Sequence, residues 1–339
     1  MKKIFLLIPV MMLALSGCNT SQNQSNKENY DVKWVTPVGA PTLAFYDQGE
    51  NENWLSTETP ANVIPGAFVA NNYDAIVFDG LTGLNLINKN ANKSHYALAR
   101  WINQLSFYLV STTHTAEEAI AADAKIDAFV QTGAASQALR RLASDSIKGW
   151  AIGELSNVTY EDGVNKVQAN LNSSDTAFDY YLLAEPVYTL TKAALANKGV
   201  TLNTIKDLQN EWYSAYGAYI PSAGLFINTD SINAHPDEMK AFINAFDSRV
   251  DDLVDNPIKA KDALLAFESK NDGNVQKHFG IGLPIVNQLD VLQATNKLGF
   301  MKDPQTTTSN MNYANSFADA LKDGGNSEPE YLENLFVNI

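Results

Sequence analysis

Few residues of this 339-residue chain have the spacing of a catalytic or metal-binding site. The four histidines, His95, His114, His235 and His278, are scattered, and none has a second histidine four residues away. The sequence contains no P-loop and no G-x-S-x-G elbow. We therefore expect no metal, no cofactor and no catalytic centre, and the remaining chemistry that the sequence favours is binding.

Two short segments share the pattern G-A-x-[ST]-x-A, and each follows a predicted strand: GAPTLA at residues 39–44 and GAASQA at residues 133–138. One interpretation is an ordinary strand-to-helix turn, in which glycine permits a tight bend and Thr42 or Ser136 caps the helix. The other is that unpaired backbone N–H groups at the start of each helix point at a ligand. Ligands of open α/β sheets bind at the carboxyl ends of strands, where both segments would lie.

Short β-branched strands alternate with helical patterns from Val32 onward, which is the order of an α/β chain built on parallel strands. An apolar run predicts a strand over 75–78, and the leucines that follow predict a helix over 81–87. An acidic first turn predicts another helix over 115–124. About 310 residues remain after the first thirty, which is too many for one typical core and favours two lobes.

The first thirty residues predict a secretory signal and a tether. A cationic start and an apolar stretch over 4–15 predict a signal peptide that covers residues 1–17. The stretch is short for a permanent spanning helix, which needs about 20 apolar residues. Residues 18–30 are nearly all polar and predict a flexible tether. No segment after residue 17 is long and apolar enough to span a bilayer.

The end of this signal resembles a bacterial lipobox, because Leu15, Ser16, Gly17 and Cys18 match its leucine, its two small residues and its cysteine. The resemblance implies that Cys18 carries a lipid, which would hold the protein at the outer face of the cytoplasmic membrane. The alternative is an ordinary signal peptide with an incidental cysteine. Cys18 is the only cysteine of the sequence, so no disulfide competes for it.

The rest of the chain resembles the substrate-binding lipoproteins of ABC importers, in the branch of nitrate, sulfonate and thiamine-precursor binders. The resemblance covers residues 32–339 and depends on the order of five segments, VTPVGAPTLAFYD, YDAIVFDGLTGLNLINKN, KIDAFVQTGAASQALRRL, YYLLAEPVYTLTKAAL and IPSAGLFIN. It implies an α/β, two-lobed, periplasmic-binding-protein-like type II fold with two hinge strands, near 106–111 and 219–227. The first lobe would comprise 31–112 and 222–339 with the C-terminal helices, and the second lobe 113–221.

The same resemblance implies that a small-molecule ligand binds between the lobes and that an ABC transporter permease recognises their closure. We expect a monomer without enzyme activity. Glu185, beside Pro186, also has a simpler interpretation as a cap or an ion-pair partner. The ligand-binding residues that the resemblance implies are Gly39, Ala40, Pro41, Thr42, Asp79, Gly80, Leu81, Thr82, Thr132, Gly133, Ala134, Ala135, Ser136 and Glu185.

Charge narrows the range of ligands. The net charge of −14, without a basic stripe, argues against nucleic acid as a partner. A carboxylate at Asp79 would repel an anion and accept hydrogen bonds from an amine. None of the four arginines, Arg100, Arg140, Arg141 and Arg249, lies in the predicted turns. We therefore expect a small amine-bearing or heteroaromatic nutrient, such as a thiamine-pathway pyrimidine.

Four aromatic residues flank the turns, Trp34, Phe45, Tyr46 and Phe78, and would either stack on a planar ligand or fill the core. Two other functions stay open at this point. One is a surface sensor or adhesion lipoprotein of the same fold without a transporter. The other is a biosynthetic enzyme of the same fold, which the lipobox disfavours because such enzymes work inside the cell.

Overall fold

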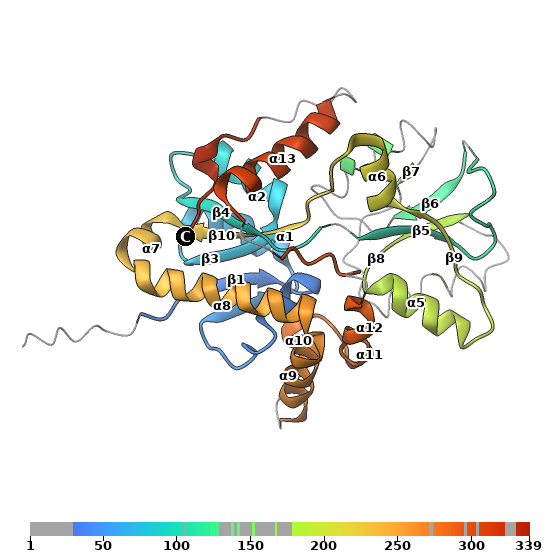
Figure 1. The fold of residues 1–339 in the computed structure, drawn as a ribbon, viewed down its shortest axis with the longest axis horizontal. Coiled ribbons are helices and arrows are strands. Elements are labelled where there is room, and N and C mark those ends of the chain that lie inside the picture. Colours follow the sequence, from blue (N-terminus) through green and yellow to red (C-terminus); the bar gives the residue numbers. More distant parts are fainter. Residues whose placement is uncertain are drawn as a thin grey trace, which may run out of the picture. The chain divides into compact units, whose positions relative to one another are not determined.

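Two five-stranded mixed sheets organise the computed structural model of this protein (Figure 1). All the elements named below belong to one compact unit, Asp31–Ile339. No helix in the described part of the chain has the length and apolarity that crossing a membrane requires. The structure describes residues 30–339 with the exception of 105, 122, 129–136, 139–140, 143–150, 153–166, 168–177, 271–273, 295–296, 303–304 and 323–329.

The first sheet has the strand order β2-β1-β3-β10-β4. Strands β1, β2 and β3 are parallel, and β10 is antiparallel to both of its neighbours, β3 and β4. The carboxyl ends of β1, β3 and β4 therefore share one edge with the amino end of β10. The bounds are β1 (Trp34–Pro37), β2 (Trp54–Thr57), β3 (Ala75–Asp79), β4 (Tyr96–Trp101) and β10 (Ala223–Asn228).

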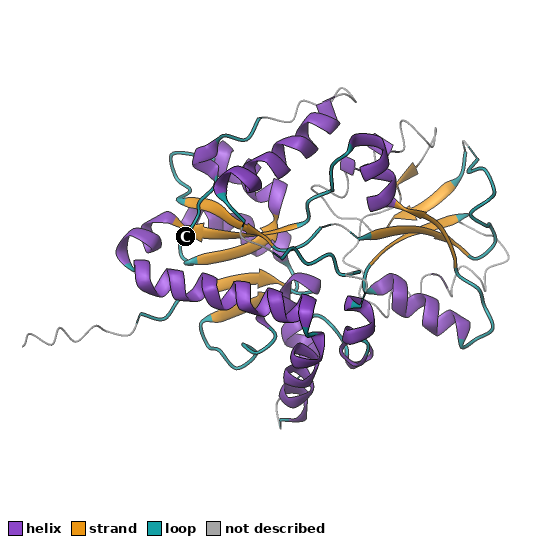
Figure 2. Cartoon of the chain, in the orientation of Figure 1, coloured by secondary structure: helices purple, strands orange, loops and turns teal. Residues whose placement is uncertain are grey.

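Helices cover both faces of the first sheet, since alternate residues of its buried strands point to opposite sides (Figure 2). Ile76 and Phe78 pack against one group of helices, and Ala75 and Val77 against the other. The first group is α1 (Pro60–Ala70), α2 (Gly80–Lys89) and α13 (Thr307–Lys322). The second group is η1 (Ala40–Phe45), α8 (Pro236–Asp255), α9 (Pro257–Ser269), α10 (Val275–Phe279), α11 (Leu283–Asn287) and α12 (Leu289–Gln293).

Two short elements complete this part of the chain. Helix α7 (Thr229–Ala234) follows β10 directly, and the 3-10 helix η2 (Glu333–Leu335) contacts β4 near the C-terminus. The predicted strand at 75–78 and the predicted helix at 81–87 are confirmed as β3 and α2.

The second sheet has the strand order β7-β6-β8-β5-β9. Strand β6 is parallel to β7 and β8, and β5 is antiparallel to β8 and β9. Helix α6 packs on one face, with Leu208 and Trp212 in the core, and α5 packs on the other. The bounds are β5 (Phe107–Ser111), β6 (Lys125–Ala128), β7 (Ala151–Ile152), β8 (Tyr180–Ala184), β9 (Asn203–Asp207), α5 (Val187–Ala196) and α6 (Leu208–Tyr216).

The described chain passes between the two sheets in two short connections, residues 102–106 and 217–222. The hinge spans predicted at 106–111 and 219–227 overlap these connections only at residues 106 and 219–222. The other residues of the two spans belong to β5 and β10. Each connection forms single bridges rather than a strand, Asn103 with Phe300 and Gln104 with Pro221. Further backbone hydrogen bonds hold these crossings, from Ile102 N to Ala223 O at 2.8 Å and from Ser222 N to Asn103 O at 3.1 Å.

The helix predicted over 115–124 is wrong, because residues 115–121 contain a turn at 116–117 and a bend at 118 and no helix. Ser111 Oγ accepts hydrogen bonds from the amides of Thr113 and His114, at 3.2 and 3.1 Å. The Glu118 carboxylate lies 2.8 Å from His114 Nδ1. These local side-chain contacts compete with a helical ladder, and they outweigh the propensity of the acidic, alanine-rich segment.

Candidate functional site

One edge of the first sheet brings together two of the predicted binding turns. Strands β1 and β3 are parallel neighbours, so the turns at 39–42 and 79–82 follow their carboxyl ends side by side. Asp79, the last residue of β3, pairs with Ala223, the first residue of β10. This is the edge at which open α/β sheets bind ligands.

The first turn is closed by the carbonyl of Phe279. Gly39 has a φ of 121°, which favours glycine, and its amide donates to Phe279 O at 2.8 Å. Thr42 Oγ1 lies 2.6 Å from Gly39 O and 2.8 Å from Phe279 O, and its side chain is fully buried. The 3-10 helix that follows has Pro41 in its first turn and no side-chain cap. The interpretation of Thr42 as a helix cap is therefore wrong, because its hydroxyl bonds to two backbone carbonyl oxygens and not to an N–H group of the helix.

In the second turn, the backbone at Gly80 lies close to the backbone that precedes β10. Asp79 is the N-cap of α2, and its Oδ1 accepts a hydrogen bond from Thr82 N at 2.8 Å. Gly80 N donates to Ser222 O at 2.8 Å. A Cβ at Gly80 would lie 1.9 Å from a ring carbon of Trp101, so only glycine fits here. Leu81 points into the core.

Glu185 begins the corresponding turn of the second sheet, directly after β8. Its amide donates to Ser106 O at 2.9 Å, and its side chain is only 7% exposed. Oε1 accepts from Thr189 Oγ1 at 2.8 Å, and Oε2 from Thr189 N at 3.3 Å. The carboxylate therefore bonds to the first turn of α5, which is the simpler interpretation that the sequence allowed.

Burial raises the pKa of Glu185 above its usual value, although the bonds from Thr189 and the charges of Lys297 and Lys192 act in the opposite direction. Among the described residues, no lysine or arginine forms an ion pair with Glu185. A buried carboxylate without an ion-pair partner costs free energy, and a ligand cation would lower that cost.

The two turn-bearing edges are linked by very little chain. Trp101 contacts Gly80 at the end of β4, and Ser106 bonds to Glu185 at the start of β5. The chain from Trp101 to Ser106 is five Cα–Cα steps long and spans at most about 18 Å when fully extended. Gly80 and Glu185 therefore contact the two ends of the same short connection.

Gln209 is a residue of this region that sequence reasoning missed. Its Nε2 lies 3.5 Å from Gln104 Oε1, and its Oε1 accepts from Ile220 N at 3.2 Å. One side chain of α6 thus contacts both connections between the sheets. A glutamine in an amphipathic helix carries no sequence signal for such a role.

The remaining sequence predictions divide as follows. The four aromatic residues that flank the turns are 0–9% exposed and belong to the core, which is one of the two alternatives that the sequence left open. Neighbouring apolar side chains pack against them instead; the Trp34 and Phe45 rings, for example, are 5.8 Å apart. Two sets of predicted residues lie outside the described residues: Cys18, and the second-lobe turn Thr132, Gly133, Ala134, Ala135 and Ser136.

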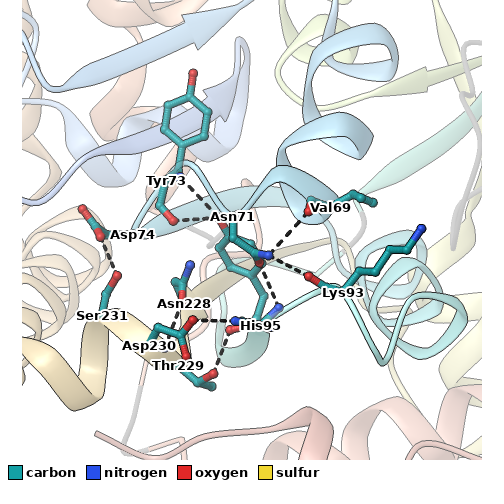
Figure 3. A network of polar contacts seen from close by, with 11 residues as sticks. Val69, Asn71, Tyr73, Asp74, Lys93, His95, Asn228, Thr229, Asp230 and Ser231 are labelled. Carbon is teal, nitrogen blue, oxygen red and sulfur yellow. Dashed lines mark hydrogen bonds and ion pairs between the residues drawn. The ribbon is translucent and has the colours of Figure 1, made fainter.

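The opposite edge of the first sheet carries a polar network of a different kind (Figure 3). Asp74, which precedes β3, accepts from Lys33 N at 2.7 Å and from Ser231 Oγ at 2.5 Å. This carboxylate is buried and joins the entry of β1 to helix α7. Its hydrogen bonds therefore connect segments that are far apart in the sequence.

Asn71 and His95 extend this network (Figure 3). Asn71 ends α1 in the left-handed conformation, with φ of 51°, and its side chain bonds to Lys93 O at 2.6 Å and to His95 N at 2.9 Å. His95 Nδ1 in turn lies 2.5 Å from Asp230 Oδ2. No group of three or more potential metal ligands is found among the residues described.

Comparisons of the sequence with known proteins give no match. No protein-family model matches this chain. No curated protein is similar to it either.

Solved structures, in contrast, share its fold. The ligand-binding component of an ABC-type import system from Staphylococcus aureus, solved with zinc bound, is similar over 91% of this chain and 96% of its own, with a TM-score of 0.59 and 11% identity. The periplasmic aliphatic sulphonate binding protein of Escherichia coli is similar over 91% and 92%, with a TM-score of 0.57 and 9% identity.

A Candida albicans protein described as having the generic periplasmic binding protein fold is similar over 88% and 92%, with a TM-score of 0.54 and 12% identity. At these identities the similarity concerns the fold. The chain has an α/β fold of the periplasmic-binding-protein type with two sheets, as its sequence predicts.

Proposed function

We propose that this protein is an extracytoplasmic solute-binding protein that captures a small nutrient and delivers it to the permease of an ABC importer. The observation that carries the proposal is the arrangement of the two sheets. Each sheet carries a turn at the edge from which the connections leave. Gly80 and Glu185 contact the two ends of one connection, Trp101 and Ser106, which are at most about 18 Å apart by the reach of an extended chain. Domains joined by such short connections close around ligands by hinge motion.

The ligand that these turns would select is cationic or neutral. Glu185 is buried without an ion-pair partner in the described chain, and Asp79 is a second carboxylate at the same group of turns. The arginines of the described residues are engaged elsewhere: Arg100 with Asp247, Arg249 with Asp47 and Arg141 with Ala320 O. The turns that the structure describes therefore contain no arginine for the bidentate clamp that sulfonates and other oxyanions favour. We propose an amine-bearing or heteroaromatic nutrient, such as a thiamine-pathway pyrimidine.

The membrane anchor is a separate part of the proposal. Its support is the lipobox-like sequence that ends at Cys18. Expression in a bacterium with labelled palmitate should give a labelled, membrane-bound protein, and Cys18→Ala should remove both the label and the membrane association. An unlabelled wild-type protein in the soluble fraction would contradict the anchor, but not the solute-binding function.

A calorimetric titration of the purified chain tests the ligand class. The titrants are a primary-amine panel, aminopyrimidines and, as the opposing class, alkanesulfonates. Saturable binding of an amine or aminopyrimidine that is weakened in Glu185→Gln supports the proposal. Binding of alkanesulfonates alone would contradict the cationic site.

The two other functions predicted from sequence have their own outcomes. A sensor or adhesion lipoprotein would bind its ligand equally well but would not stimulate a permease and ATPase encoded beside it. An enzyme of the same fold would convert the bound compound, which product analysis after prolonged incubation detects. Recovery of the ligand unchanged supports binding without turnover.

A further inference from the structure

A pocket of about 200 Å³ lies between α8 and the segment that follows Phe300, and none of its lining residues belongs to the turns. Phe246, Val250 and Met301 supply apolar surface, and the side chains of Phe246 and Val250 are almost fully buried. The pocket is lined by Phe246, Asp247, Val250, Asp251, Met301, Lys302 and Gln305.

Among the described charged residues that line this pocket, one carboxylate, that of Asp251, has no ion-pair partner. Asp247 is paired with Arg100, whose Nε and Nη2 donate to its two oxygens, each at 3.0 Å. Lys302 is paired with Asp255. Asp251 has no hydrogen-bond or ion-pair partner among the described residues. The pocket therefore combines an apolar floor with one uncompensated negative charge at its rim.

That combination matches a cation on an aliphatic stem. The stem would lie on Val250 and Met301, while an ammonium or guanidinium group would donate hydrogen bonds to Asp251 and to the remaining lone pairs of Asp247. An anion would meet two carboxylates and only one lysine, which already has a partner. The net charge of −14 favours the approach of a cation as well.

Residues that line the pocket also form hydrogen bonds and an ion pair with the end of β4 and the residue that follows it. Arg100 pairs with Asp247. Trp101 N donates to Gln305 Oε1 at 2.6 Å, and Gln305 Nε2 donates back to Trp101 O at 2.7 Å. Ile102 O accepts from Met301 N at 3.0 Å. Three consecutive residues, at the point where the chain leaves the first sheet, are thus each held by a residue that lines the pocket.

We propose that this pocket is a second binding site, for an alkylammonium or alkylguanidinium group, and that its occupancy is transmitted to the connection between the sheets through Arg100, Trp101 and Ile102. The cation would come either from a free small molecule or from a lysine or arginine side chain of a partner protein. The site does not depend on the solute bound at the turns.

An NMR titration of the isotope-labelled protein with n-butylguanidinium tests this proposal. Saturable shifts are expected for the amides of 247–251 and 301–302, together with those of Trp101 and Ile102. Asp251→Asn should weaken the apparent affinity about fivefold, the size of one exposed ion pair. Asp262→Asn is the matched control, because Asp262 is an exposed aspartate on the neighbouring helix α9, outside the pocket.

Each outcome has a definite meaning. The absence of saturable shifts, or equal weakening by Asp251→Asn and Asp262→Asn, would overturn the site. Shifts confined to the pocket, with Trp101 and Ile102 unchanged, would overturn the transmission. A second titration with acetyl-Gly-Arg-Gly-amide separates the sources: tighter binding of the peptide assigns the site to a partner's side chain, and tighter binding of n-butylguanidinium assigns it to a free cation.

Discussion

The two edges of the first sheet are built from different groups. At the amino edge, side chains bond to side chains and to backbone, as Asp74 does with Lys33 and Ser231. At the carboxyl edge, the turns after β1 and β3 are each closed by a contact between backbone groups, Gly39 N with Phe279 O and Gly80 N with Ser222 O. The first arrangement uses its polar side chains to join distant segments, whereas the second forms tight turns whose surfaces a small molecule can approach closely.

This comparison teaches that density of polar contacts is a poor guide to function in this fold. The network of Figure 3 contains a histidine, two aspartates and a serine, yet its contacts connect α1, α7 and three strand ends to one another. The turns after β1 and β3 offer fewer such contacts, those of the Thr42 hydroxyl and of the Asp79 carboxylate. The edges should therefore respond differently to mutation, with stability changing at one and ligand affinity at the other.

The largest effect is expected at Gly80. A Cβ there would lie 1.9 Å from the buried Trp101 ring, so Gly80→Ala should lower the free energy of unfolding by about 3 kcal/mol. Urea denaturation measures the change. Gly66→Ala is the control, because no atom lies within 4 Å of its new Cβ, and it should be neutral or slightly stabilising. Equal stability of Gly80→Ala and wild type would contradict the tight packing of this turn.

Asp74→Ala tests the amino edge. The substitution leaves Lys33 N and Ser231 Oγ without their buried acceptor and should cost about 2 kcal/mol of unfolding free energy. Affinity for the solute should stay unchanged, because Asp74 lies at the edge opposite the turns. Chemical denaturation and calorimetry on the same variant measure both quantities. A loss of affinity at full stability would move the binding site to this edge.

Two substitutions of Asp79 separate its role as a helix cap from a role in ligand binding. Asp79→Ala removes the N-cap of α2 and should cost about 1 kcal/mol of unfolding free energy, whereas Asp79→Asn keeps a capping side chain and should cost little. If the carboxylate contacts a cationic ligand, Asp79→Asn should still weaken binding. Unchanged affinity in Asp79→Asn would leave this side chain with the capping role alone.

The smallest effect is expected in the pH dependence of stability that Glu185 causes. Burial raises its pKa in the folded protein, so the folded state holds the proton more tightly than the unfolded state does. Stability should therefore fall as the pH rises from the usual glutamate pKa through the raised value, and Glu185→Gln should remove that decrease. Thermal unfolding of both proteins from acidic to neutral pH measures the difference. A stability difference between the two proteins that is independent of pH would contradict the raised pKa. A bound cation should reduce the pH dependence of the wild-type stability.

The sequence predicted the local elements well where pattern and packing agree. The apolar run at 75–78 and the leucine periodicity after it gave β3 and α2, because both are buried in the core of the first sheet. The prediction failed at 115–124, where Ser111 and His114 form side-chain contacts that propensity does not include. It also failed for Thr42, whose hydroxyl partner Phe279 lies 237 residues away.

By itself, the sequence determined the α/β alternation, the glycine positions of the turns and the lack of metal or nucleophile motifs, since these depend on residue type and near neighbours. Only the tertiary structure decided that Glu185 is buried beside Thr189, that Gln209 contacts both connections, and that Arg100 is paired with Asp247 rather than turned toward a ligand. The physical reason is that burial and long-range pairing arise from which strands become neighbours. Hydrogen bonds between residues 100 or more positions apart leave no periodic trace in a single sequence.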